Sequence, residues 1–288
     1  MKDSGRPPSP GGVVWLVDSA VELVLLGAEC PEERAFAGSL GAAAGAQRFG
    51  RAVAAAMLDA GPGRCRVTAV DPAADANALH AALKQAAGRG GRLLVVYLAG
   101  QLAWDPRRRR PVVVTAGSLR ENAASRGLPC EWVVSAMAHS GQAERLLVLD
   151  AVADSAVWQD WQPEELRRQL PAWGRLVRQE SSRRGRAESG GSAGGFAALL
   201  ADALEQGVPG APAALDPYAL QPALDRADAP GARWVGPPPE SRLLLRNRAA
   251  LRGCWGRGAV PGCPRLDMIT INSWRIFGQT GDRPRKAE

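Results

Sequence analysis

Two stretches of almost continuous apolar residues limit the fold more than any other feature of the chain. They are RLLVVYLAG at 92–100 and RLLVLDA at 145–151. A strand with apolar residues at consecutive positions is buried on both faces, as a central strand of a parallel sheet covered by helices must be. A chain of 288 residues is long enough to bury such a sheet in one core.

The rest of the chain alternates between strand and helix patterns. Further strands are expected at 21–29, 65–71 and 172–179, with short ones at 107–117 and 241–247, and helices at 39–61, 75–91, 129–141, 196–207 and 216–227. Ser39 and Gly61 are expected to cap the first helix. The alternation predicts an α/β fold: a single doubly wound, mostly parallel sheet with helices on both faces.

Composition suggests three parts along the chain. Residues 1–20 are expected to be a disordered leader, because they begin with a polar run rich in proline and glycine. Residues 21–252 form the predicted α/β domain, in which 181–195 is expected to be an exposed loop. All three isoleucines lie within 265–288, so 253–288 is predicted to be an appended tail.

Charge, cysteine and histidine content narrow the classes of function. The net charge is +7, but the basic residues are nearly all arginine, as a GC-rich coding sequence gives, so the charge is a weak indicator of nucleic-acid binding. The five cysteines form no CxxC pair and there are only two histidines, so we expect no metal site and no cofactor. With no signal peptide or apolar span in the sequence, a cytoplasmic protein without membrane contact is expected.

The residues at the ends of the two central strands carry a resemblance to a known family. The first strand runs into VVYLAGQL (95–102), and the second runs into VLDAVADSA (148–156). Their order, spacing and local sequence resemble the caspase-like cysteine peptidases, a clan that includes metacaspases and bacterial, notably actinobacterial, caspase domains. The resemblance covers roughly residues 20–250. In that clan the corresponding strands end near SGHG, with the catalytic histidine, and in DxCHSG, with the catalytic cysteine.

Carried over position by position, the resemblance implies that the catalytic residues are missing. Gln101 stands at the histidine position and Val152 at the cysteine position, followed by Ala153. Valine cannot act as a nucleophile, and glutamine cannot take up a proton at neutral pH. The resemblance therefore implies a degenerate site at which peptide hydrolysis by the cysteine–histidine route is lost.

Together with Ala153, three further residues belong to the expected remnant of the pocket. Asp150 matches an acid that in metacaspase-like enzymes helps to recognise a basic substrate residue; alternatively, it is a strand-end residue that accepts backbone hydrogen bonds. Asp154 and Ser155 follow the strand at the edge where open α/β sheets bind ligands. A nucleophilic serine would need a histidine base, and none lies nearby in the sequence.

A relocated cysteine–histidine pair is the remaining route to catalysis. Cys130 and His139 lie on the same predicted helix. Nine residues at about 1.5 Å each separate them by about 13.5 Å along the axis, which is too far for proton transfer. They are therefore expected to be packing or surface residues.

Tryptophans and arginines are the candidates for binding partners. Trp104, Trp132, Trp158, Trp161 and Trp173 are expected around the cleft, either as packing or as an aromatic patch in which Trp104, Trp158 and Trp161 contact a protein partner. Arg107–Arg110 and Arg183–Arg186 are candidates for anion binding.

Three functional hypotheses follow. The leading one is a catalytically inactive caspase-like protein that acts as a scaffold or regulatory binding partner. The first alternative is a divergent caspase-like cysteine endopeptidase with relocated catalytic residues, and the second is an arginine-rich adaptor that binds nucleic acid or another anion. The sequence identifies no particular partner.

Overall fold

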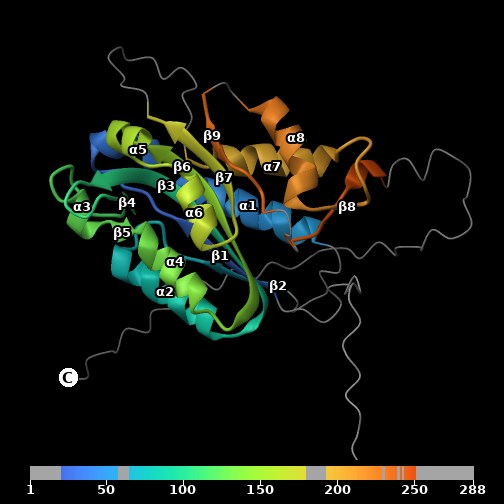
Figure 1. Cartoon of the computed structure of the whole chain (residues 1–288), viewed down its shortest axis with the longest axis horizontal. Helices are drawn as coiled ribbons and strands as arrows, with labels where there is room; N and C mark the ends of the chain where they lie inside the picture. Colours follow the sequence, from blue (N-terminus) through green and yellow to red (C-terminus); the bar gives the residue numbers. More distant parts are fainter. Residues whose placement is uncertain are drawn as a thin grey trace, which may run out of the picture.

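The computed structural model of the chain describes residues 21–57, 65–179, 193–228, 231–238, 241 and 243–250 (Figure 1). The predicted leader at 1–20, nearly all of the predicted loop at 181–195 and the predicted tail at 253–288 lie outside these residues. Within the described residues, no helix combines the length and apolarity needed to cross a membrane.

The core of the molecule is one mostly parallel sheet. Its strands lie in the order β2 (Cys65–Ala69), β1 (Val21–Gly27), β3 (Gly91–Asp105), β6 (Gln142–Ala153), β7 (Ala172–Arg178) and β9 (Arg233–Val235). The first five are parallel to one another, and β9 is antiparallel to β7. The hairpin arm predicted at 107–117 is β4 (Arg110–Val113), which turns back along the end of β3 and pairs with the short β5 (Leu128–Pro129).

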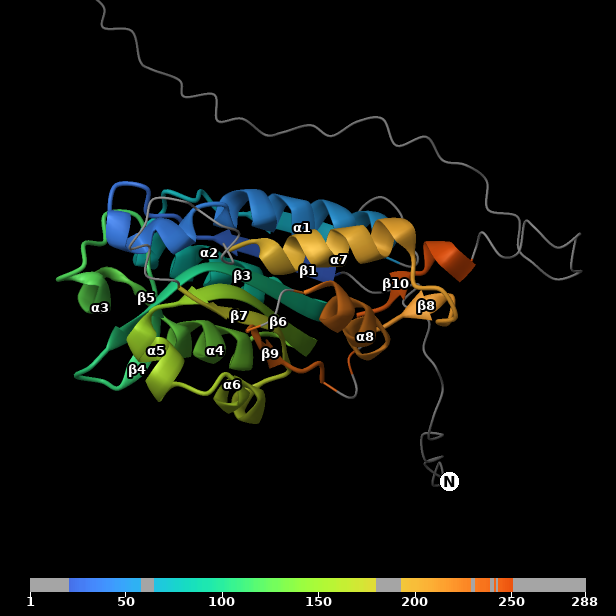
Figure 2. The same ribbon diagram turned by 90° about the horizontal axis from the view of Figure 1, so that it is seen from above.

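Helices cover both faces of the sheet (Figure 2). One face carries α1 (Ala42–Ala56), α7 (Gly195–Gln206) and α8 (Pro217–Ala227), and the other carries α2 (Ala76–Gly88), α4 (Cys130–Ala138), α5 (Ser155–Asp160) and α6 (Glu164–Gln169). The short helices η2 (Arg34–Ser39) and α3 (Ala123–Arg126) lie beyond the carboxyl end of β3 and beside β4. The predicted fold class, a doubly wound α/β sheet, is confirmed.

Strand β3 shows why both faces need cover. Val95 and Tyr97 point into the core beneath α1 and α7, whereas Val96 and Leu98 point into the core beneath α2 and α4. All four side chains are at most 2% exposed. Because successive side chains of a strand alternate between faces, a continuously apolar strand requires two cores, and the sequence pattern at 92–100 predicted this correctly.

The start of α1 differs from the prediction. Ser39 does not cap the helix, because its hydroxyl is buried and accepts a hydrogen bond from the backbone N–H of Cys30 at 2.9 Å. Instead, Glu29 accepts hydrogen bonds from the N–H groups of Gly41 and Ala43, both at 3.0 Å. Gly41 has a φ of 91°, a left-handed turn that glycine tolerates and that separates Ser39 from the helix. The predicted cap at Gly61 lies outside the described residues.

The strand predicted at 241–247 is only the two-residue β10 (Leu245–Arg246), and it pairs with β8 (Ala214–Leu215) outside the main sheet. Asn247 fixes this region. Its buried carboxamide accepts hydrogen bonds from the N–H groups of Val208 and Ala249, and donates to the carbonyl groups of Val208, Ala211 and Pro212. The last described segment is therefore held to the domain by a polar side chain.

Replacing Asn247 should test that role. Asn247→Ala removes the partner of several buried backbone groups, so we expect a loss of about 2–3 kcal/mol in the free energy of unfolding. Asn77→Ala, at an exposed position of α2, is the matched control and should change stability by less than about 0.5 kcal/mol. Urea denaturation measures both; equal stabilities for the two variants would contradict this account.

Candidate functional site

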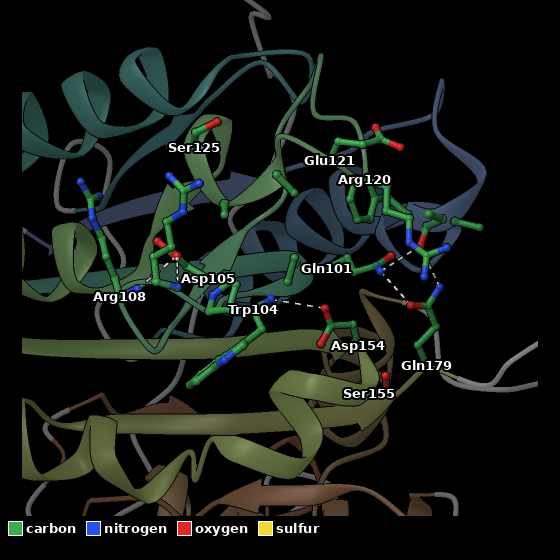
Figure 3. Close-up of a pocket in the computed structure, with 18 of the residues that line it drawn as sticks. Gln101, Trp104, Asp105, Arg108, Arg120, Glu121, Ser125, Asp154, Ser155 and Gln179 are labelled. Carbon is green, nitrogen blue, oxygen red and sulfur yellow. Dashed lines mark hydrogen bonds between the residues drawn. The ribbon is translucent and has the colours of Figure 1, made fainter.

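A cleft of about 1260 Å³ lies at the carboxyl end of β3 (Figure 3). Gln101, Ala103 and Asp105 of β3 line it, η2 forms one wall, and the segment 120–125 forms another. Asp154, Ser155 and Gln179, which follow the carboxyl ends of β6 and β7, complete the lining. This is the edge of an open α/β sheet at which ligands commonly bind.

The structure places the two expected degenerate positions side by side. Gln101 of β3 and Val152 of β6 are direct partners in the register of the two parallel strands. Two side chains at such positions belong to adjacent strands and reach the same edge of the sheet. The two positions that the family resemblance selected are therefore neighbours in space.

Neither member of this pair is open to solvent, since Gln101 and Val152 are each 1% exposed. The carboxamide of Gln101 donates to the carbonyl oxygen of Ala35 at 3.1 Å and to Oε1 of Gln179 at 2.8 Å. Gln179 donates in turn to the same carbonyl of Ala35 at 3.1 Å. Figure 3 shows the two glutamines meeting at one end of the cleft.

The segment 35–38 covers Val152 as closely as it covers Gln101. A Cβ atom added to Gly38 would lie 2.8 Å from Cγ1 of Val152 and 3.0 Å from Oε1 of Gln101. These separations are shorter than normal van der Waals contact, so only glycine allows the backbone to lie this close to the strand ends. The segment is thus packed directly over the two positions.

Asp150 does not line the cleft. It lies on the same face of the sheet as Val152 but further from the end of β6, beneath α7, where its Oδ2 atom accepts hydrogen bonds from the hydroxyl of Tyr97 at 2.6 Å and the N–H of Ala197 at 3.1 Å. The carboxyl is 1% exposed. Of the two roles expected for Asp150, the geometry supports the acceptor of backbone hydrogen bonds rather than the pocket acid.

The environment of Asp150 acts on its pKa in opposing directions. Burial raises the pKa, while the hydrogen bond from Tyr97, the positive charge of Arg175 and the N–H groups of Ala197 and Phe196 lower it. Burial is the largest of these effects, so the pKa lies above the usual range of an aspartate. Burial, together with the charge of Asp150, also raises the pKa of Tyr97.

Asp154 and Ser155 do line the cleft, as expected. Asp154 is the N-cap of α5: one carboxylate oxygen accepts from the N–H of Val157 at 2.7 Å and the other from the N–H of Trp104 at 3.3 Å. Ser155 is exposed. Ala153 is buried and takes no part in the lining. The carboxylate of Asp154 thus has a structural role, and no histidine lines the cleft to activate Ser155.

The expectation that five tryptophans surround the cleft is wrong for four of them. Only Trp104 is among the lining residues. Trp161 and Trp173 are 4% and 0% exposed and fill the two cores, which leaves neither ring free for a partner. Trp158 lies under the guanidinium of Arg233, at 4.0 Å from the ring centre, and Trp132 packs on His80.

The remaining candidates for catalysis lie elsewhere in the fold. Cys130 is buried at the start of α4, where burial raises the pKa of its thiol to about 12. His139 lies at the other end of the same helix, with Nδ1 at 2.8 Å from the carbonyl oxygen of Ser135. Neither residue lines the cleft, and neither does His80, the other histidine of the chain. Among the described residues, no group of three or more potential metal ligands is found.

Sequence reasoning missed Gln179 and the segment 34–38. Gln179 directly follows β7, and the carboxyl ends of parallel strands meet at one edge, so its position beside the ends of β3 and β6 was available as a signal. The sequence carries no comparable signal for the cover formed by residues 35–38.

A scan against models of protein families finds no match, and a search of curated protein sequences finds no significant relative.

The raised pKa of Asp150 predicts the pH dependence of stability. The folded state binds the carboxyl proton of Asp150 more tightly than the unfolded state does. The stability that this protonated group contributes is therefore fully present at low pH and is lost as pH rises through the pKa of the folded state. Asn at this position does not titrate. The stability of Asp150→Asn relative to wild type should therefore increase with rising pH.

Urea denaturation at a series of pH values measures this difference. Asp160→Asn, at an exposed position of α5, is the matched control and should show a small difference that hardly varies with pH. A relative stability of Asp150→Asn that falls as pH rises would mean that its pKa is lowered rather than raised.

Proposed function

We propose that this chain is a catalytically inactive protein of caspase-like fold that acts by binding, as a scaffold or regulator of a protein partner. Two features support the family relationship. The sheet is of the doubly wound α/β type, and the two positions that match the catalytic histidine and cysteine are neighbours at the carboxyl ends of adjacent parallel strands. Fold alone does not define function, so the site must carry the argument.

One observation carries the proposal of inactivity. Gln101 and Val152 are each 1% exposed, beneath a backbone segment that is bonded to one and packed on the other. A substrate carbonyl group must approach a nucleophile to within about 3–3.5 Å for reaction. The cover occupies that approach, so the site lacks both the reactive groups and the space that peptide cleavage requires.

The alternative of a peptidase with relocated catalytic residues receives no support from the cleft. Neither histidine of the chain lines it, and neither do the three cysteines of the described residues, Cys30, Cys65 and Cys130; Cys30 is buried behind the lining residues Phe36 and Ala103. Burial also raises the pKa of each of these thiols, which disfavours the thiolate needed for attack. Binding remains the function that the geometry of the cleft supports best.

Peptidase assays test this proposal. The wild-type protein should cleave no fluorogenic peptide after arginine, lysine or aspartate, with or without calcium. Gln101→His combined with Val152→Cys should remain at background, because the segment 35–38 still covers both positions. An active caspase-like peptidase serves as the assay control. Robust wild-type cleavage that a thiol alkylator abolishes would overturn the proposal.

A further inference from the structure

Four exposed arginines line the cleft without an acidic partner. Arg34 comes from η2, Arg107 and Arg108 from the turn between β3 and β4, and Arg120 from the segment before α3. Within the described part of the chain, none of the four forms an ion pair. Segments far apart in the sequence thus bring their guanidinium groups to one cleft.

The acidic groups of the lining form no ion pair with these arginines, and two of the three are turned toward backbone N–H groups. Asp105 is 4% exposed, and its Oδ1 atom accepts hydrogen bonds from the backbone N–H groups of Arg107 and Arg108. Asp154 uses both oxygens to accept backbone N–H groups. Only Glu121 has an exposed carboxylate in the lining. The cleft therefore presents more accessible positive than negative charge.

The backbone that carries each arginine is held in place. Asp105 closes the turn that carries Arg107 and Arg108, and Arg109 in that turn has a left-handed φ of 51°. The carbonyl of Ala35, next to Arg34, accepts from both Gln101 and Gln179. The segment of Arg120 is fixed by a hydrogen bond from the N–H of Leu119 to Asn122 at 2.7 Å. Such anchoring lowers the entropic cost of binding a ligand.

The charges are distributed along the cleft. Figure 3 shows Arg108 and Arg120 toward opposite ends of the site, with Gln101 and Asp105 between them. The volume of about 1260 Å³ exceeds the ~300–1,000 Å³ of most small-molecule pockets. A single compact anion would contact one end only, so an extended ligand with repeated negative charge fits the arrangement better.

We propose that the cleft binds a linear chain of phosphate groups, as found in a single-stranded nucleic acid or a polyphosphate. Guanidinium groups form paired hydrogen bonds with phosphate oxygens. A phosphate chain carries its charge in the backbone itself and can meet both ends of the cleft. In an extended acidic peptide, successive side chains point to opposite sides, so half of the carboxylates would face away from the arginines.

Fluorescence anisotropy tests this inference with a fluorescein-labelled oligothymidine of about ten nucleotides, a length within the range of known single-strand sites. Four phosphate contacts predict that affinity falls about fifty-fold between 50 and 200 mM salt, since each contact adds about −0.7 to the logarithmic slope. Arg108→Ala combined with Arg120→Ala should bind more weakly at 50 mM and lose only about seven-fold over the same range.

The matched control combines Arg51→Ala and Arg168→Ala, which removes the same charge from exposed positions of α1 and α6 outside the cleft. It should retain the wild-type salt dependence. Melting temperatures equal to that of wild type establish that both double variants are folded. No binding by the wild type at 50 mM salt, or equal losses in the two double variants, would overturn the inference.

Competition identifies the source of the phosphate. Displacement by unlabelled polyphosphate and by oligonucleotide supports a site for the phosphate chain, whereas displacement by oligonucleotide alone restricts the ligand to nucleic acid. Equal displacement by oligoglutamate of the same charge would overturn recognition of phosphate. This inference rests on the proposed non-catalytic use of the cleft. The peptidase assay and the anisotropy assay measure different properties, so a failure of this inference is distinguishable from a failure of the proposed function.

Discussion

The position of α7 over the sheet depends on the buried carboxyl group of Asp150. Its side chain lies under α7, where Tyr97 and the backbone of Ala197 donate hydrogen bonds to it. A charged or polar group removed from water is costly unless hydrogen bonds replace those of the solvent. Helix α7 must therefore begin at the point where its first N–H groups reach β6, and a negative group at a helix N-terminus is also favoured by the helix dipole. The polar contact thus sets the position of an apolar element.

Two glycines in close contact allow α7 to begin at this point, near Asp150. Helix α7 begins beside α1, where side chains on Gly45 or Gly194 would overlap the backbone of the other helix, and Gly194 has a left-handed φ of 94°. Side chains on either glycine would push the start of α7 away from Asp150. On the next strand, Arg175 packs against Gly195 and forms a buried ion pair with Asp228 at the end of α8. Polar contacts therefore fix α7 and α8 relative to the sheet in addition to the apolar packing of the layer.

The sequence predicted the sheet well because its signal is local. The continuous apolar runs at 92–100 and 145–151 could be buried only as central strands, and parallel pairing then placed Gln101 beside Val152. The predictions from sequence were wrong where contacts between distant parts of the chain compete with local ones. Glu29 replaced Ser39 as the acceptor for the first turn of α1 because a turn at Gly41 intervenes. Trp161 was expected to contact a partner but packs in the core. The residues next to it in the sequence do not indicate whether a tryptophan there is buried or exposed.

Residues only a few positions apart at the carboxyl end of β6 have different surroundings. Asp150 contributes to the core beneath α7, whereas Asp154 and Ser155 face the cleft only a few residues later. Gln101 donates one hydrogen bond to the carbonyl oxygen of Ala35, in the segment that packs over Val152, and a second to Gln179, which itself donates to the same carbonyl. A neutral histidine has one N–H group and could not make both. Gln101 therefore anchors the wall of the cleft that residues 35–38 form, and a histidine at this position would leave that wall with fewer hydrogen bonds.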